Sequence, residues 1–105
     1  MRTLVSKASF GQAKYEPIRS VIYLPREEKF EVEFDSGDYA LLSHQEMRQA
    51  NHLPKEHAPI DSIWIDAETR SGFFVRYADK TTAEASWELI LELPPDASSH
   101  LAPVK

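Results

Sequence analysis

The chain has 105 residues, 42% of them hydrophobic, which is enough for one folded domain with a single core. It contains no cysteine, which excludes disulfides, thiolate catalysis and cysteine-ligated zinc and leads us to expect a cytoplasmic protein. The net charge of −5 argues against direct nucleic-acid binding, and no apolar run approaches the roughly 20 residues of a membrane span.

The first residues differ in charge from those that follow. Residues 1–19 carry four basic side chains and one acidic, whereas residues 20–70 carry eleven acidic and five basic. Residues 1–17 are predicted to form a flexible basic arm, because residues 1–15 show neither a strand period nor a helix period. An edge strand through Leu4 and Val5 and an organelle transit peptide are the alternatives for this composition.

The first half of the domain predicts three strands and a helix. Residues 18–24 are rich in β-branched side chains and stop at a proline that begins a turn. In residues 29–34 apolar and charged side chains alternate, as in a strand with one buried face. The sequence Asp-Ser-Gly-Asp at 35–38 predicts a tight hairpin to a strand over 39–42. Ser43 with Glu46 then matches a capping box, which predicts a helix of about two turns.

The second half repeats this order after a loop over residues 52–59. Strands are predicted over residues 60–65, 72–77 and 81–85. Ser86 can cap a helix over residues 87–93, which two prolines then end. Residues 96–105 lack periodicity and are predicted to be a disordered tail.

These elements predict an α+β fold. Two similar halves, residues 18–51 and 60–95, would each form an antiparallel β-meander (a ββ-hairpin, a third strand and a helix) within a single domain that has one core. Recurring identities such as Phe30 and Phe73 leave open whether the halves are a true duplication or only share an architecture. The expected core consists of Val21, Tyr23, Phe30, Val32, Phe34, Leu41, Ile63, Ile65, Phe73, Val75 and Leu89.

An acidic cluster is the most distinctive chemical feature of the chain. Its six carboxylates belong to Glu27, Glu28, Glu31, Glu33, Asp35 and Asp38. Glu31 and Glu33 are expected on the outer face of their strand, because alternate residues share a face. Such an acidic stripe suits a basic partner protein or mimics nucleic-acid phosphates. A charged outer face is also an ordinary way to block edge-to-edge pairing of sheets.

Two adjacent phenylalanines indicate a second candidate surface. Phe73 and Phe74 must point to opposite faces of one strand, so one of them lies outside the main core. Phe74, with Arg76 two residues further on, is expected to anchor a partner protein or a second copy of the chain in a homodimer.

Metal binding and catalysis are not expected. His44, His52 and His57 lack the i, i+4 spacing of a zinc-binding helix, and loop histidines usually lie at the surface. Ser43 and His44 are neighbours that point apart at a helix start, so they do not form a nucleophile–base pair. The three glycines do not form a phosphate-binding loop. We therefore expect no metal, no cofactor and no enzymatic activity.

The chain resembles small bacterial proteins known only as a domain of unknown function. The resemblance covers residues 18–93 and rests on Val32–Asp38 leading to Leu42, on Ile63–Ile65, and on Val75–Asp79 before the terminal helix. It implies two β-rich halves, each with an Asp-Gly-type turn, and a role as an antitoxin or adaptor, since some of those proteins are encoded beside a toxin-like partner. Asp79-Lys80 departs from that turn pattern.

One function is preferred and two alternatives remain. The preferred function is a non-catalytic protein-binding module of antitoxin, adaptor or inhibitor type, in which the acidic hairpin speeds encounter and Phe74 and Arg76 hold the partner. The first alternative is a small ligand-binding or enzymatic domain with a pocket between the halves, which converging carboxylates or histidines would indicate. The second is an anti-defence protein that mimics nucleic acid.

Overall fold

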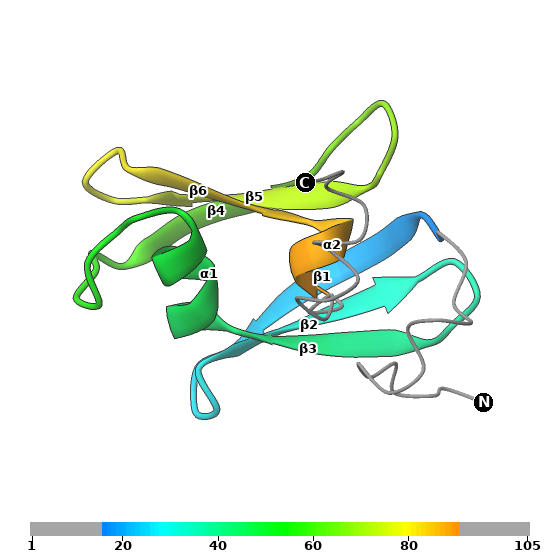
Figure 1. Cartoon of the computed structure of the whole chain (residues 1–105), viewed down its shortest axis with the longest axis horizontal. Coiled ribbons are helices and arrows are strands. Elements are labelled where there is room, and N and C mark those ends of the chain that lie inside the picture. The colour runs from blue at the N-terminus through cyan, green and yellow to red at the C-terminus, as the bar shows by residue number, and fades with distance from the viewer. Residues whose placement is uncertain (1–15, 91–105) are drawn as a thin grey trace, which may run out of the picture.

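The computed structural model describes residues 16–90, which form two antiparallel three-stranded sheets and two short helices (Figure 1). The first half contains β1 (Ile18–Leu24), β2 (Lys29–Phe34), β3 (Tyr39–Ser43) and α1 (His44–Ala50). The second half contains β4 (Ile60–Ile65), β5 (Gly72–Tyr77), β6 (Thr82–Ser86) and α2 (Trp87–Ile90). The molecule is small and β-rich, and no helix in residues 16–90 is long and apolar enough to cross a membrane.

In the middle strand of each sheet, buried side chains alternate with more exposed ones, and this alternation shows which face of the sheet is buried. β2 pairs with β1 and β3 in the first sheet, and β5 pairs with β4 and β6 in the second. Three side chains of each middle strand are buried: Phe30, Val32 and Phe34 in β2, and Phe73, Val75 and Tyr77 in β5. Their neighbours Glu31 and Phe74 lie on the outer faces, because successive side chains of a strand point to opposite sides.

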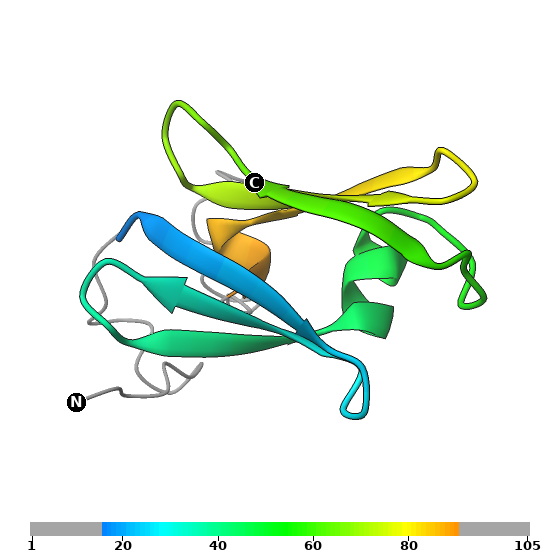
Figure 2. The ribbon, with the colours of Figure 1, turned by 180° about the vertical axis from the view of Figure 1, so that it is seen from behind.

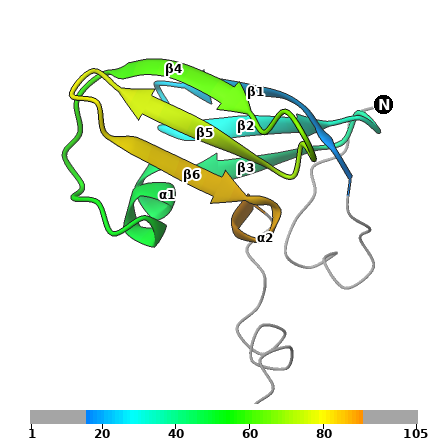
Figure 3. The same ribbon diagram turned by 90° about the horizontal axis from the view of Figure 1, so that it is seen from above.

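The two sheets lie face to face, and their buried faces form one core (Figure 2). The rings of Phe30 and Phe73 meet across this core with their centroids 5.3 Å apart. β1 and β4 adjoin along one side, where the Ile18 amide donates to the Arg70 carbonyl at 2.9 Å. Both helices lie along the other side, beside β3 and β6 (Figure 3). They cover apolar side chains that the two sheets alone would leave open on that side.

Most of the expected core residues are buried or packed against the core. Five of them are half-buried at its margin: Val21, Tyr23, Ile63, Ile65 and Leu89. The prediction was wrong for Leu41, because Ala40 and Leu42 are the buried residues of β3, where they pair with the inward-facing Val32 and Phe30. The core also contains residues that were not predicted: Ile18, Ala40, Leu42, Met47, Tyr77, Ala83, Ala85 and Ile90.

The element order β-β-β-α occurs in both halves. The likeness between the halves also includes their local hydrogen bonds. In the β2–β3 turn the Gly37 amide donates to the Phe34 carbonyl, and in the β5–β6 turn the Lys80 amide donates to the Tyr77 carbonyl. Gly37 and Lys80 both have positive φ angles, of 97° and 75°. A register shift also interrupts strand pairing directly after the first residue of β1 and of β4.

The helix starts follow the predicted caps. The Ser43 hydroxyl accepts a hydrogen bond from the Glu46 amide at 3.2 Å, and the Ser86 hydroxyl accepts one from the Leu89 amide at 3.4 Å. These bonds satisfy amides that have no partner within their own helix. α2 reaches the last described residue, so the predicted helix over residues 91–93 lies outside the described part of the chain.

The predicted arm and tail lie largely outside the described residues, namely at 1–15 and 96–105. The last two residues of the predicted arm are described and contact the β2–β3 turn. The Glu16 carboxylate accepts from the Ser36 hydroxyl at 2.6 Å, and the Pro17 carbonyl accepts from the Asp35 amide at 3.0 Å. The folded unit therefore begins slightly before β1.

Candidate functional site

The six acidic residues expected to form one stripe lie at three places. Glu27 and Glu28 are exposed in the β1–β2 turn, Glu31 and Glu33 are half-buried on the outer face of β2, and Asp35 and Asp38 lie in the β2–β3 turn. A strand of this length spans about 20 Å. The two pairs of turn acids therefore sit at opposite ends of the first sheet.

Two of these carboxylates have arginine partners. Arg19 donates to the Glu33 carboxylate at 3.0 Å, and Arg70 donates to both oxygens of Asp35 at 3.1 and 2.9 Å. The Arg70 pair joins the β4–β5 turn to the β2–β3 turn, so it links the two sheets. The acidic stripe is therefore partly neutralised by the protein itself.

Phe74 lies on the outer face of the second sheet, as predicted, but together with a tryptophan. The Phe74 ring stacks on Trp64 with centroids 5.4 Å apart and an interplanar angle of 23°. Trp64 is 43% exposed, and Arg76 is exposed on the same face. We call Trp64 and Phe74 the aromatic pair. A pocket of about 220 Å³, lined in part by Phe74 and Glu84, adjoins it.

The aromatic pair and the acidic outer face of β2 lie on opposite sides of the molecule. Each belongs to the outer face of its own sheet, and the two sheets turn their inner faces toward each other (Figure 1). The residues predicted to bind one partner therefore do not form a single surface. Sequence alternation assigns a residue to a face of its own sheet, but it does not say how two sheets are stacked.

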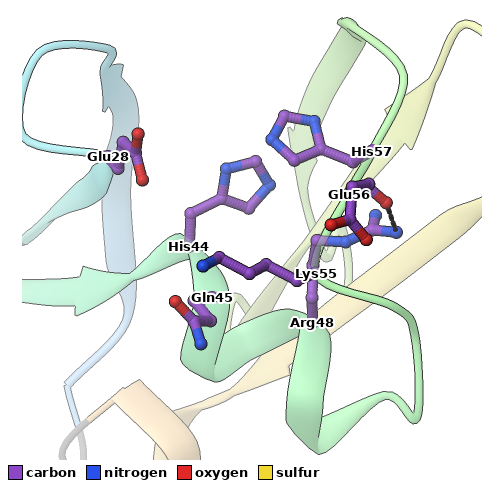
Figure 4. A pocket seen from close by; sticks show the side chains of 7 residues that line it. All are labelled: Glu28, His44, Gln45, Arg48, Lys55, Glu56 and His57. Carbon is purple, nitrogen blue, oxygen red and sulfur yellow. Dashed lines mark hydrogen bonds between the residues drawn. The ribbon is translucent and has the colours of Figure 1, made fainter.

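A pocket of about 320 Å³ lies beside α1, between the loop over 51–59 and the β1–β2 turn. The residues that line it include Glu28, His44, Arg48, Lys55, Glu56 and His57 (Figure 4). The rings of His44 and His57 lie side by side there, with centroids 4.2 Å apart. We call this hollow the Arg48 pocket.

His44 is a buried residue with 3% exposure, although the sequence placed it among surface histidines. Its Nδ1 is hydrogen-bonded to the Tyr23 hydroxyl at 3.0 Å and its Nε2 to the Tyr77 hydroxyl at 2.8 Å. Burial, and then the nearby His57 and Arg48, lower the pKa of His44 to about 4. The ring is therefore neutral near pH 7, with one nitrogen that donates and one that accepts.

Arg48 is also buried, with 4% exposure. Its Nε donates to the Pro54 carbonyl at 2.7 Å, and Nη2 donates to the Glu56 carbonyl at 3.0 Å. The guanidinium carbon lies 4.8 Å from the centre of the Tyr77 ring, within the range of a cation–π interaction. Arg48 thus holds the loop after α1 against the second sheet.

Sequence reasoning missed this cluster, although a signal for it existed. The buried residues of α1 are His44, Met47 and Arg48, which have the i, i+3, i+4 spacing of one helix face. A histidine and an arginine at two of these positions were not expected inside. The tyrosine partners of His44 come from β1 and β5, far away in sequence, and the carbonyl partners of Arg48 come from the irregular loop that follows the helix.

The cluster contains no arrangement that indicates a reaction. Ser43 caps α1, while His44 turns toward Tyr23 and Tyr77, so the two adjacent side chains serve different contacts. Within residues 16–90, no three histidine, aspartate or glutamate side chains lie close enough together to hold a metal ion. What the cluster offers is hydrogen-bond donors and a buried positive charge.

No family model, no curated protein and no solved structure matches the chain. The functional proposals below therefore start from two separate features of the structure, the aromatic pair and the Arg48 pocket.

Proposed function

We propose that this chain is a non-catalytic protein-binding module, of adaptor, inhibitor or antitoxin type, that docks its partner on the outer face of the second sheet. The observation that carries the proposal is Trp64, which is 43% exposed on this face and stacked on Phe74. Aromatic residues that are already held in place lose little conformational freedom on binding, and they often dominate binding energy.

The surroundings of the aromatic pair suit a protein partner. Arg76 is exposed on one side of Phe74 and Glu84 on the other, so charged groups border an apolar centre. The adjoining pocket of about 220 Å³ has room for one side chain of the partner. An apolar centre with a polar border is the usual composition of a protein–protein interface.

The acidic side of the molecule takes a secondary role in this proposal. Glu27 and Glu28 are exposed and far from the aromatic pair, and Glu33 and Asp35 are paired with arginines. We propose that these carboxylates speed the approach of a basic partner in the cytoplasm rather than contact it. The nucleic-acid mimic receives less support, because it needs its carboxylates unpaired.

The test is to capture the partner with the tagged full-length chain, identify it, and measure the dissociation constant by calorimetry. Trp64→Ala should weaken binding at least tenfold, because the stacked indole provides most of the apolar contact. Ile22→Ala is the matched control. Ile22 is 52% exposed at the corresponding position on the outer face of the first sheet, and its replacement should leave the affinity unchanged.

Two results would contradict the proposal. The first is an identified partner whose affinity is the same for Trp64→Ala and the wild type. The second is a loss of affinity in Ile22→Ala alone, which would move the docking face to the first sheet. Sedimentation analysis of the chain by itself decides whether the partner is a second copy, since a homodimer through this face must dissociate in Trp64→Ala.

We further propose that the two halves derive from one duplicated unit. The shared turn bonds, the shared positive φ angles and the register shifts at the start of β1 and β4 support this origin. Common architecture alone would require alternation and turns, but not an irregularity at the same place in both sheets.

A further inference from the structure

The buried positive charge of Arg48 is not compensated by a carboxylate. Its hydrogen-bond partners are the carbonyl oxygens of Pro54 and Glu56, and among the described residues it makes no ion pair. Its Nη1 is shielded from solvent and has no hydrogen-bond partner within residues 16–90. A buried cation with an unused donor is unfavourable, and the ring of Tyr77 offsets only part of that cost.

The pocket around Arg48 offers further groups that suit a negatively charged ligand. Lys55 brings an ammonium group to the lining, and His57 brings an imidazole beside His44. Glu28 and Glu56 also line the pocket and, like Lys55, are exposed, so the guanidinium of Arg48 is the one buried charge of the lining. Water screens the three exposed charges, whereas the buried guanidinium would repel a cation and attract an anion.

We propose that the Arg48 pocket binds a small oxyanion, either a carboxylate or a tetrahedral anion of the phosphate type. One oxygen of this anion accepts a hydrogen bond from Arg48 Nη1, and another contacts Lys55. Guanidinium–oxyanion hydrogen bonds are short and strong because both groups are charged. This inference does not depend on the docking of a protein at the aromatic pair, which belongs to the outer face of the other sheet.

Because Nη1 is shielded from solvent, the proposal requires the loop over residues 54–57 to move before an anion can contact this nitrogen. This segment is exposed along its outer side and is attached to the helix through the two carbonyl bonds of Arg48. The pocket of about 320 Å³ is large enough for an acetate or sulfate ion. Binding should therefore change the environment of the Arg48 side chain and of the loop amides together.

The test is a nuclear magnetic resonance titration of the full chain with sodium sulfate and, separately, with sodium acetate. Sodium chloride at equal ionic strength serves as the reference. We expect saturable shifts of the Arg48 Nε–H signal and of the amides of residues 55–57. Lys55→Gln should weaken the binding about tenfold, because it removes one charged donor. Lys29→Gln removes the same charge from the outer face of β2, which does not line the pocket, and it should leave the affinity unchanged.

The outcomes separate clearly. Saturation by sulfate alone identifies a site for phosphate-type anions, saturation by acetate alone identifies a carboxylate site, and both support the proposal. Shifts that merely follow ionic strength, or that weaken equally in Lys29→Gln, would overturn it. So would the absence of any saturable shift at Arg48, which leaves a water molecule as the partner of Nη1. Because Lys55 is exposed, its replacement tests the site without removing the loop contacts of Arg48.

Discussion

At the scale of single residues, His44 shows how a polar side chain can complete an apolar core. Its two ring nitrogens are satisfied by Tyr23 and Tyr77, and its edge contacts the ring of Phe30 at a centroid distance of 5.2 Å. Burial raises the pKa of both tyrosines, so their hydroxyls stay protonated and able to donate near neutral pH. The neutral imidazole thus joins β1 to β5 through α1.

Stability should decrease when the pH falls through the range in which His44 takes up a proton. The folded pKa of His44 is about 4 and its ordinary value is 6.5, so the unfolded chain binds this proton first. The contribution is complete above about pH 6.5 and is lost toward about pH 4, with an upper limit of about 3 kcal/mol. Urea unfolding at a series of pH values measures it.

The variant His44→Phe separates this effect from the titration of carboxylates in the same range. It should be less stable than the wild type near pH 7, because it removes the hydrogen bond that each of the two tyrosine hydroxyls makes with His44. Its stability should then fall less steeply than that of the wild type below about pH 6.5. Equal pH slopes for the two proteins would show that His44 does not carry the effect.

At the scale of elements, the β2–β3 and β5–β6 turns share a backbone hydrogen bond and a positive φ angle, but different residues adopt that angle. Gly37 adopts its positive φ without steric cost, whereas Lys80 has a Cβ in a backbone region that disfavours it. A side chain in each turn accepts a local hydrogen bond: the Ser36 hydroxyl accepts from the Asp38 amide at 3.2 Å, and the Asp79 carboxylate accepts from the Thr81 amide at 3.0 Å. The second turn therefore forms in spite of its residue at 80.

Lys80→Gly should raise the free energy of unfolding by about 0.5–1 kcal/mol, because relief of the positive φ exceeds the extra freedom of glycine in the unfolded chain. Thermal and urea unfolding measure the change. Lys80→Ala removes the same charge without relieving the backbone, so it should give no such gain. If alanine stabilises as much as glycine, then charge, and not φ, is the cause.

At the scale of the whole molecule, the halves depend on each other through the core. The Phe30 ring from the first half meets the Phe73 ring from the second, and α1 and α2 each contact strands of both sheets. The Arg70–Asp35 pair and the bond between Ile18 and Arg70 add polar links between the sheets. One sheet alone would expose its entire apolar face to water.

Fragments that end in the loop between the halves should therefore not fold separately. Residues 16–51 and 60–90 each fall short of the roughly 40 residues that a domain needs without disulfides or metals. Far-ultraviolet circular dichroism of each fragment should show a disordered chain, whereas the two together should recover β structure. Cooperative unfolding of either fragment alone would contradict the shared core.

Much of the fold could be predicted because its determinants are local. Alternation in residues 29–34, the Asp-Ser-Gly-Asp turn and the capping serine each act within a few residues, and the corresponding strands, hairpin and helix start are all observed. Leu41 was assigned to the wrong face because Leu41 and Leu42 are both apolar, which leaves the phase of the strand open. Its register with β2 decides the matter.

The sequence by itself determined the order of strands and turns and the outward position of Phe74, since these follow from alternation and turn chemistry. Only the tertiary structure decided that Trp64 joins Phe74, that the acidic face lies on the opposite side, and that His44 and Arg48 are buried. The physical reason is that these features depend on the stacking of two sheets and on the contacts of α1 with β1, β5 and the loop after it. A pattern within one strand or helix carries no information about either.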